Sequence, residues 1–345
     1  METEVIAIDP VTPRRGPLAR AVEVLRRGGL VAFPTETVYG LGANALDIAA
    51  VAKIFAAKGR PATNPIIVHV ASSEQVSEVA AQWPPLAQAL AERFWPGPLT
   101  LVLPKNPSIN DIVTGGGDTV AVRLPAHPVA RGLIRAAGLP IAAPSANLST
   151  RVSPTRAEHV LRGLAGCIDL LLDGGPTAGG LESTVLDLTT TPPMLLRPGL
   201  VSPQEIEEVI GPIQRLRIPD ILLPSSPARS PGMLRRHYAP SVPLECLSAS
   251  RPRVEALCRA GLRVGWLTLG PAARDEQSGL FAIELPADPA GYSSQLYAAL
   301  HTLEALAPDW IVVELPPDGE AWLAVRDRLR RAATEPIRQF GIGRP

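Results

Sequence analysis

The sequence predicts an α/β protein with two domains, and three observations support this fold class. Short apolar runs alternate with amphipathic helical patterns, which is typical of a sheet covered by helices. The runs in the first 210 residues are closely spaced, which favours a mixed sheet over a purely parallel one. From residue 211 the chain becomes rich in Pro and Ser, and the alternation resumes after residue 242.

In the first part, helix and strand signals follow one another closely. A helix is expected over 47–58 because Asp47 is a good N-cap and Gly59 stands just past the end. The other expected helices cover 18–27, 86–94 and 128–137. Strands are expected over 30–33, 66–70, 99–103, 119–124, 140–143, 169–173, 183–188 and 194–197.

The last hundred residues predict a smaller α/β unit. Strands are expected over 262–268, 280–285 and 309–315, with helices over 290–306 and 319–333. We therefore predict a first domain over 1–210, a linker or lid over 211–242, and a second domain over 243–345. Within the linker, we expect residues 226–240 to close over a site and exclude water.

Composition excludes several classes of protein. The 345 residues are 46% hydrophobic and carry a formal net charge of zero, which argues against tight, non-specific nucleic-acid binding. Three cysteines without a CxxC pair, and scattered histidines, predict neither a disulfide framework nor a metal site. There is no signal-peptide pattern and no apolar run long enough for a membrane span. We expect a cytoplasmic protein.

The segment between Asp47 and Glu74 contains no acidic residue, although Lys53, Lys58 and Arg60 all lie in it. Arginine suits bidentate phosphate contact, and lysine acts as a point charge. The following Pro61-x-x-Asn64-Pro65 restricts the backbone where Arg60 and Asn64 emerge. These features predict an anion site, although the basic residues could equally form a solvated helix face.

Three ionisable side chains interrupt or end apolar strands. Arg123 and Arg197 each stand at a strand end, and His69 lies inside the strand at 66–70. Because a buried charge needs a partner, Arg123 must pair with a carboxylate of the protein or of a ligand. His69 is either a core histidine with satisfied hydrogen bonds or a ligand contact.

Hydroxyl and amide side chains gather in loops after strands. Ser145 and Asn147 alternate after one strand, and Ser153 precedes a further expected helix. Ser153 could be an ordinary N-cap. Glu182 and Ser183 follow two glycines, where turn chemistry is the simplest explanation.

Familiar nucleotide motifs are missing from the sequence. There is no GxxxxGK[ST] loop, and the GxGxxA match at 40–45 lacks an acidic residue near position 62. No GxSxG elbow or Ser-His-Asp order supports an activated nucleophile. The chemistry expected is therefore positioning and charge stabilisation.

A series of short patterns occurs in a fixed order: PTETVYGLG, KGRPATNPIIVHV, TVAVRLPAHP, PSANLS, SPT, ESTV and LRPG. Together they resemble the YrdC-like threonylcarbamoyl-adenylate synthases over about residues 15–205. HYAP at 237–240 and the C-terminal segment are similar to the longer, two-domain branch of that family. The resemblance implies a twisted, mixed-sheet YrdC-like domain followed by a smaller Rossmann-like α/β domain.

The resemblance also implies a reaction. L-threonine and bicarbonate form N-carboxy-threonine, whose carboxylate attacks the α-phosphorus of ATP, and pyrophosphate leaves. The product, threonylcarbamoyl-AMP, supplies the group that a tRNA threonylcarbamoyl transferase machinery places on tRNA. Mg²⁺ is expected on the ATP phosphates, held by phosphate and water. Weak direct binding of tRNA is also expected.

Site residues are implied at the matching positions. The resemblance assigns L-threonine binding to Thr35, His69, Arg123, Ala143 and Ser183, with Arg123 on the amino-acid carboxylate. It assigns ATP binding to Lys53, Arg60, Asn64, Thr119, Ser145, Asn147, Ser153, Arg197 and Tyr238, and catalytic charge stabilisation to Lys58 and Arg60. Ala143 is a departure, because many relatives carry threonine there.

Two other functions fit parts of the sequence. An RNA-binding or ribosome-maturation module without catalysis would show steep salt dependence of RNA binding and no ATP turnover. A carbamoyl-adenylate enzyme of another pathway would not depend on L-threonine, and its usual acylphosphatase and zinc-type segments are not found here.

Overall fold

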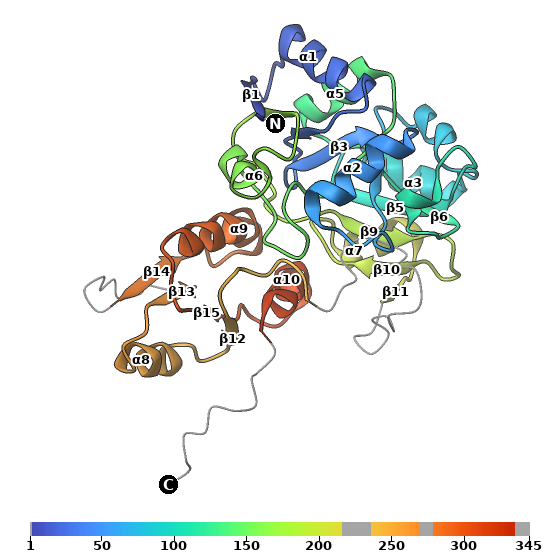
Figure 1. The fold of residues 1–345 in the computed structure, drawn as a ribbon. Helices are drawn as coiled ribbons and strands as arrows, with labels where there is room; N and C mark the ends of the chain where they lie inside the picture. The colour runs from blue at the N-terminus through green and yellow to red at the C-terminus, as the bar shows by residue number, and fades with distance from the viewer. Residues whose placement is uncertain (1, 216–235, 270–278, 335–345) are drawn as a thin grey trace.

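The computed structural model describes residues 2–215, 236–269 and 279–334. Two sheets organise them, a large one from the first part of the chain and a small one from the last part (Figure 1). Within the segment expected to act as a lid, residues 226–235 lie outside the described residues, whereas His237 and Tyr238 lie inside them. None of the described helices is both long and apolar enough to cross a membrane.

The large sheet has 11 strands in the order β1-β8-β2-β3-β7-β4-β6-β5-β9-β10-β11. The sheet contains both parallel pairs, such as β4 with β6, and antiparallel pairs, such as β5 with β6, so the predicted mixed sheet is confirmed. Its strands are β1 (Glu4–Ala7), β2 (Val31–Phe33), β3 (Gly40–Asn44), β4 (Ile67–His69), β5 (Leu99–Pro104), β6 (Thr119–Arg123), β7 (Ile141–Ala142), β8 (Leu170–Asp173), β9 (Thr184–Asp187), β10 (Met194–Arg197) and β11 (Gln214–Arg215). Strand β11 lies inside the segment expected to be a linker.

Helices cover this sheet from both sides. They are α1 (Arg15–Arg26), α2 (Ile48–Lys58), α3 (Pro85–Phe94), α4 (Asp111–Thr114), α5 (Pro128–Ala137), α6 (Ala157–Leu164) and α7 (Pro203–Ile210), with a 3₁₀ turn, η1 (Glu74–Glu78). In β2, alternate residues enter different cores. Ala32 packs in the cluster that contains α2 and α3, and Val31 in the one that contains α1 and α5.

Helix α2 forms as its sequence predicts. The Asp47 side chain accepts hydrogen bonds from the amides of Ala49 and Ala50, and Gly59 ends the helix with a φ of 59°. Only glycine takes this left-handed conformation at little energetic cost, so both ends of the helix follow from local sequence.

Strand β3 is an element that the sequence did not predict. Its sequence, GLGAN, is poor in strand-forming residues, yet it pairs antiparallel with β2. A Cβ atom on Gly42 would lie 2.7 Å from the Phe33 ring and 2.8 Å from Ile141 Cγ2. Gly42 is there because neighbouring side chains pack against the backbone, which is a packing reason and not a dinucleotide turn.

The small sheet has the order β12-β15-β13-β14, and all of its pairs are parallel. Its elements are β12 (Leu244–Leu247), α8 (Arg251–Arg259), β13 (Val264–Thr268), β14 (Leu280–Glu284), α9 (Pro289–Ala305), β15 (Trp310–Glu314), η4 (Glu320–Trp322) and α10 (Leu323–Ala332). Strand β12 and helix α8 were not predicted. Helices α9 and α10 lie toward the larger sheet, and α8 lies on the opposite side (Figure 1).

One hydrophobic cluster joins the two parts of the chain. Val38, Val152 and Leu181 from the first part pack with Tyr238 and with apolar residues of α9 and α10 such as Leu296. Burying apolar surface on both sides fixes how the domains meet, so that side chains of the second domain reach the region beside Ser153 and Glu182.

Candidate functional site

A pocket opens on one face of the large sheet, around the ends of β4 and β6. Residues two apart in a strand share a face, so Ile67 and His69 of β4 lie beside Ala121 and Arg123 of β6. The pocket is lined by Thr35, Thr37, Val38, Tyr39, Gly40, Arg60, Ile67, His69, Arg123, Ala143, Pro144, Ser145, Glu182, Ser183, Arg197, His237 and Tyr238. Segments far apart in sequence thus meet at one place.

Arg123 is almost completely buried and makes three contacts with the protein. Its Nη2 lies 2.5 Å from Glu36 Oε1, its Nη1 donates to Thr37 Oγ1 at 3.0 Å, and its Nε donates to the Gly97 carbonyl at 3.2 Å. The partner left open by the sequence is therefore a protein carboxylate in this structure. The other Glu36 oxygen, Oε2, is buried and has no hydrogen-bond partner among the described residues.

Thr35 is held inside the same corner. Its hydroxyl donates to the Val38 carbonyl at 2.6 Å and lies 2.8 Å from Thr37 Oγ1. Because Thr37 also accepts from Arg123, the Thr-Glu-Thr turn surrounds the guanidinium with oxygen atoms. A rigid, buried guanidinium of this kind is suited to recognise a carboxylate.

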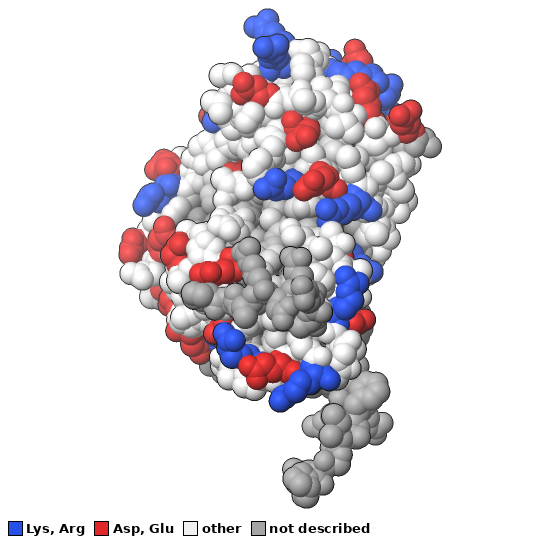
Figure 2. All heavy atoms as spheres, turned by 90° about the vertical axis from the view of Figure 1, so that its left-hand side faces the viewer, with Lys and Arg blue, Asp and Glu red and all other residues white. Residues whose placement is uncertain are grey.

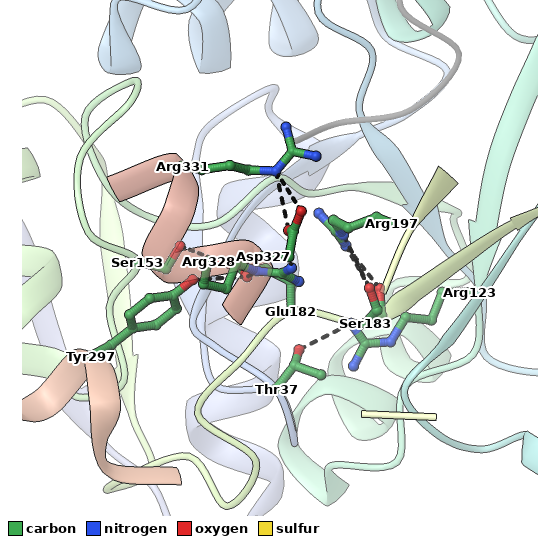
Figure 3. Close-up of polar contacts among 10 residues, drawn as sticks. All are labelled: Thr37, Arg123, Ser153, Glu182, Ser183, Arg197, Tyr297, Asp327, Arg328 and Arg331. Atoms are coloured by element: carbon green, nitrogen blue, oxygen red, sulfur yellow. Dashed lines mark hydrogen bonds and ion pairs between the residues drawn. The ribbon is translucent and has the colours of Figure 1, made fainter. Parts of the chain in front are cut away.

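Arg197 lies across the pocket, at the end of β10. Its guanidinium donates to the Ser183 carbonyl at 2.9 Å and to Ser183 Oγ at 3.1 Å (Figure 3). Ser183 Oγ in turn lies 2.7 Å from Thr100 Oγ1. These bonds fix the turn before β9, so Ser183 has a defined place in the pocket wall.

Arg60 is turned back onto its own loop. Its Nε donates to the Asn64 carbonyl at 3.1 Å and its Nη2 to the Pro65 carbonyl at 2.7 Å. Burial lowers the pKa of the Arg60 guanidinium to about 10, so it stays charged at neutral pH. The Asn64 side-chain Nδ2 is buried without a partner among the described residues.

Lys58 is buried behind the pocket wall instead of lining it. Its ammonium donates to the carbonyls of Ser145, at 2.6 Å, and of Asn147. Burial, and then the nearby Arg60, lower the pKa of Lys58 well below its ordinary value. Lys58 therefore holds the PSANLS loop in place, and Ser145 of that loop lines the pocket.

Ser153 does not cap a helix, because Arg156 stands at the N-cap position of α6. Its hydroxyl instead donates to Glu182 Oε1 at 2.5 Å (Figure 3). Although burial by itself raises the pKa of the Glu182 carboxyl, Arg328, Arg197 and this hydrogen bond hold it at about 2. Glu182 is a pocket residue that the sequence interpretation treated only as turn chemistry.

The two histidines of the pocket are neutral. Burial, and then the Arg123 guanidinium, lower the pKa of His69 to about 3, and burial lowers that of His237 to about 3. Nδ1 of each ring and the Tyr238 hydroxyl are buried without a hydrogen-bond partner among the described residues. Buried polar atoms without partners are uncommon in proteins, and these three belong to residues that line one pocket, as expected of ligand contacts.

Of the fifteen predicted residues, nine line the pocket, three bond to its wall or the adjoining loop, Asn64 accepts a hydrogen bond from Arg60 of the lining, and Thr119 and Lys53 belong to none of these sets. Thr35, Arg60, His69, Arg123, Ala143, Ser145, Ser183, Arg197 and Tyr238 line the pocket. Lys58, Asn147 and Ser153 bond to residues of its wall or of the adjoining loop. Thr119 shares a face of β6 with Arg123 and stands at the other end of that strand. Ala143 presents only a methyl group, and its amide donates to the Ile67 carbonyl.

The assignment of Lys53 to ATP binding is not supported, because the structure does not bring this residue to the pocket. It lies on α2 five positions before Lys58, which places the two side chains about 140° apart around the helix. Lys53 is exposed, and its ammonium donates to the Gly28 carbonyl at 2.6 Å.

The pocket does not form a metal cage. Among its described lining residues Glu182 is the only carboxylate, and that group is engaged by Ser153, Tyr297 and Arg328. The described residues contain no cluster of three or more His, Cys, Asp or Glu side chains that could hold an ion. A divalent cation here would depend on oxygen atoms brought by a ligand and by water.

Comparison with known proteins gives the same assignment for both parts of the chain. A family model described as telomere recombination (Sua5, YciO and YrdC) matches residues 23–199, and one described as threonylcarbamoyl-AMP synthase, C-terminal domain, matches residues 201–334. The threonylcarbamoyl-AMP synthase of Pyrococcus abyssi is 47% identical over 323 residues, which cover 91% of this chain and 93% of the relative. That of Bacillus subtilis is 45% identical, covering 92% of each.

A solved structure matches the whole arrangement. The crystal structure of P. abyssi Sua5 complexed with L-threonine superimposes with a TM-score of 0.88 at 44% identity, covering 96% of this chain and 98% of that one. Fold and pocket thus define a YrdC-like α/β protein with a buried site rich in arginine. The chain belongs to the threonylcarbamoyl-AMP synthase family, in the form that carries the additional C-terminal domain.

Proposed function

We propose that the pocket joins L-threonine, bicarbonate and ATP into threonylcarbamoyl-AMP and releases pyrophosphate. The observation that carries this proposal is the convergence of Arg60, Arg123 and Arg197 in one pocket, together with buried polar atoms that have no partner among the described residues. An amino-acid carboxylate and a polyphosphate are both anions, and arginine is the side chain best suited to bind each of them.

Threonine is assigned to the corner formed by Thr35, His69, Arg123 and Ser183. Arg123 already has its charge balanced by Glu36 and retains guanidinium N–H groups beyond its three described bonds. A substrate carboxylate would take those donors. Neutral His69 offers an unpartnered ring nitrogen to the substrate without adding charge. Ala143 supplies a methyl wall in place of a hydroxyl.

ATP is assigned to the adjoining wall, formed by Arg60, Ser145, Arg197 and Tyr238, where Arg197 donates to Ser183 of the threonine corner. Asn64, Thr119, Asn147 and Ser153 belong to the same proposed set, and Lys53 does not. Lys58 contributes by fixing the carbonyls of the loop that carries Ser145. Mg²⁺ would be held by the phosphates and water, where it would neutralise phosphate charge, and no protein cage is required.

The chemistry requires no nucleophile from the protein. The N-carboxy group of threonine is itself the nucleophile, and its carboxylate oxygen attacks the α-phosphorus of ATP as pyrophosphate leaves. The pocket brings the two anions together and stabilises the charge that develops on the phosphate oxygens. We assign this stabilisation to Arg60 and Arg197. Burial excludes water, which protects the mixed anhydride that forms.

The test is release of pyrophosphate from ATP and bicarbonate, with and without L-threonine. Release should depend on threonine, and Arg123→Ala should raise the KM for threonine at least tenfold. Arg123→Lys, which keeps a charge beside Glu36 but loses the planar fork, separates carboxylate recognition from folding. Arg330→Ala, at an exposed position of α10, should behave as wild type. Release indifferent to threonine would refute the substrate assignment, and no release would refute the enzyme assignment.

We further propose that a tRNA threonylcarbamoyl transferase machinery in the cytoplasm consumes the product, with weak direct binding of tRNA. The distribution of surface charge does not favour the RNA-binding alternative without catalysis. On the face shown in Figure 2, basic and acidic side chains are interspersed, and no extended basic stripe covers the described residues. Such a face offers little of the phosphate-binding charge that RNA recognition needs.

A further inference from the structure

Glu182 lies where the two domains meet the pocket. It is buried and accepts hydrogen bonds from Ser153 Oγ of the first domain, and from the Tyr297 hydroxyl at 3.1 Å and Arg328 Nε at 2.7 Å of the second (Figure 3). One carboxylate therefore joins a proposed ATP residue to helices α9 and α10. The reaction itself assigns no role to Glu182.

Arg328 is the deepest charged residue of the second domain, with 1% of its surface exposed. Its guanidinium lies between Glu182 and Asp327, and its carbon centre stands 5.0 Å from the middle of the Tyr238 ring. That distance is typical of a cation–π contact. Arg328 thus touches two residues of the pocket lining, Glu182 and Tyr238, although it comes from the other domain.

Helix α10 also holds the backbone next to Tyr238. The His237 amide donates to the Arg331 carbonyl at 3.0 Å, and Asp327 accepts from both Arg328 and Arg331. Tyr238 itself has a φ of 61°, a left-handed conformation that a tyrosine adopts only when its surroundings enforce it. The contacts with α10 are part of that enforcement.

The Glu182 carboxylate is an anion in the wall of a pocket that is proposed to bind another anion, a polyphosphate. This carboxylate is negative at neutral pH and lies next to Ser183, in the same wall as Arg197. Without Arg328, this charge would repel ATP and would draw Arg197 toward itself. L-threonine is affected less: its corner is reached only through the bond from Arg197 to Ser183, whereas Arg123 lies beside its own balancing carboxylate, Glu36.

We propose that Arg328 is a positioning residue through which the C-terminal domain prepares the ATP side of the pocket: it neutralises Glu182 and holds Tyr238 in the wall. This inference rests on the proposed function only in naming ATP as the ligand of that wall. It gives the second domain a specific task, since a first domain alone lacks both the cation and the helix that fixes His237.

The first measurement uses the full-length protein without ligands. Amide hydrogen exchange at 237–239 is followed in wild type, Arg328→Met, Arg328→Lys and the exposed control Arg330→Met on the same helix. The amides of His237 and Ala239 are both hydrogen-bonded, so slow exchange is expected in wild type. Arg328→Met should raise exchange there at least tenfold while strands β4 and β6 keep wild-type protection. Unchanged exchange at 237–239 would overturn the proposal.

The second measurement compares the Kd of ATP with the Kd of L-threonine, by calorimetry. Arg328→Met should weaken ATP binding at least tenfold and threonine binding less than twofold, whereas Arg330→Met should change neither. Adding Glu182→Gln to Arg328→Met removes the uncompensated carboxylate, so the double variant should regain part of the ATP affinity. Arg328→Lys should lie between wild type and Arg328→Met, because it keeps the charge.

The outcomes separate this inference from the proposed function. Equal weakening of ATP and threonine in Arg328→Met, or no recovery in the double variant, would mean that Arg328 is a general structural residue and would overturn the proposal. Wild-type protein that binds no ATP would refute the proposed function instead, and hydrogen exchange alone would then decide whether Arg328 holds Tyr238.

Discussion

Two lysines on helix α2 differ in which groups their side chains contact. Lys53 and Lys58 both belong to α2, but the exposed Lys53 donates to the Gly28 carbonyl, away from the pocket, and Lys58 is enclosed beside the pocket. The sequence predicted a phosphate-neutralising role for both. In the structure only Lys58 meets the PSANLS loop, and it does so through backbone carbonyls.

At the residue scale we predict that Lys58→Met destabilises the protein by about 2 kcal/mol, because the Ser145 and Asn147 carbonyls lose their shared hydrogen-bond donor. Displacement of that loop should also raise the KM for ATP. Equilibrium unfolding in urea and steady-state kinetics measure the two effects. Lys53→Met on the same helix is the comparison: this exposed lysine donates to one carbonyl, that of Gly28, and its loss should cost about 1 kcal/mol or less. Wild-type stability in Lys58→Met would contradict the role assigned here.

At the scale of the element, helix α2 depends on its caps. The Asp47 carboxylate accepts from two amides of the first turn, which would otherwise have no partner within the helix. The helix ends at Lys58, so its geometry determines where that ammonium lies. The Asp47 cap therefore helps to position Lys58, which holds the pocket loop that carries Ser145.

We predict that Asp47→Ala lowers the free energy of unfolding by about 1 kcal/mol, the usual effect of losing an N-cap. Asp47→Asn keeps a capping oxygen and should lose much less. The measurement is urea denaturation of both variants, with kcat and KM as a check that the site is intact. Equal stabilities of the Ala and Asn variants would show that the cap contributes nothing.

At the scale of the whole molecule, the histidines link stability to pH. Burial is the first cause of a lowered pKa at every one of the five, His69, His127, His159, His237 and His301. In the unfolded chain these rings bind protons near pH 6.5, whereas His69 and His237 in the folded protein do so only near pH 3.

Because the unfolded state takes up protons first, stability should fall as pH drops below about 6.5. His69 and His237 together should give a slope of about 3 kcal/mol per pH unit between about pH 6 and pH 4. Glu182, whose pKa is lowered, should add to the loss below about pH 4.5. Urea midpoints at pH 7, 6 and 5 test this, and His237→Gln should reduce the slope. A midpoint independent of pH over this range would contradict the prediction.

Local signals predicted elements well and predicted contacts between elements poorly. The bounds of α5 and β10 match the expected ranges, 128–137 and 194–197, because periodicity, proline and glycine act over a few residues. Strand β3 was not predicted, because its glycines are explained only by the packing of Phe33 and Ile141 against them. The caps of α2 were predicted, and the direction of its two lysines was not.

By itself, the sequence determined the α/β class, the mixed sheet, the family resemblance and most residues of the pocket, because apolar periodicity and short motifs are local properties. Only the tertiary structure decided that Arg123 pairs with Glu36, that Ser153 binds Glu182, and that Arg328 of the other domain pairs with Glu182. Glu182 and Arg328 are 146 positions apart, and burial of a shared apolar core brings them together. No local pattern encodes such a pair, since its energy depends on how two domains exclude water between them.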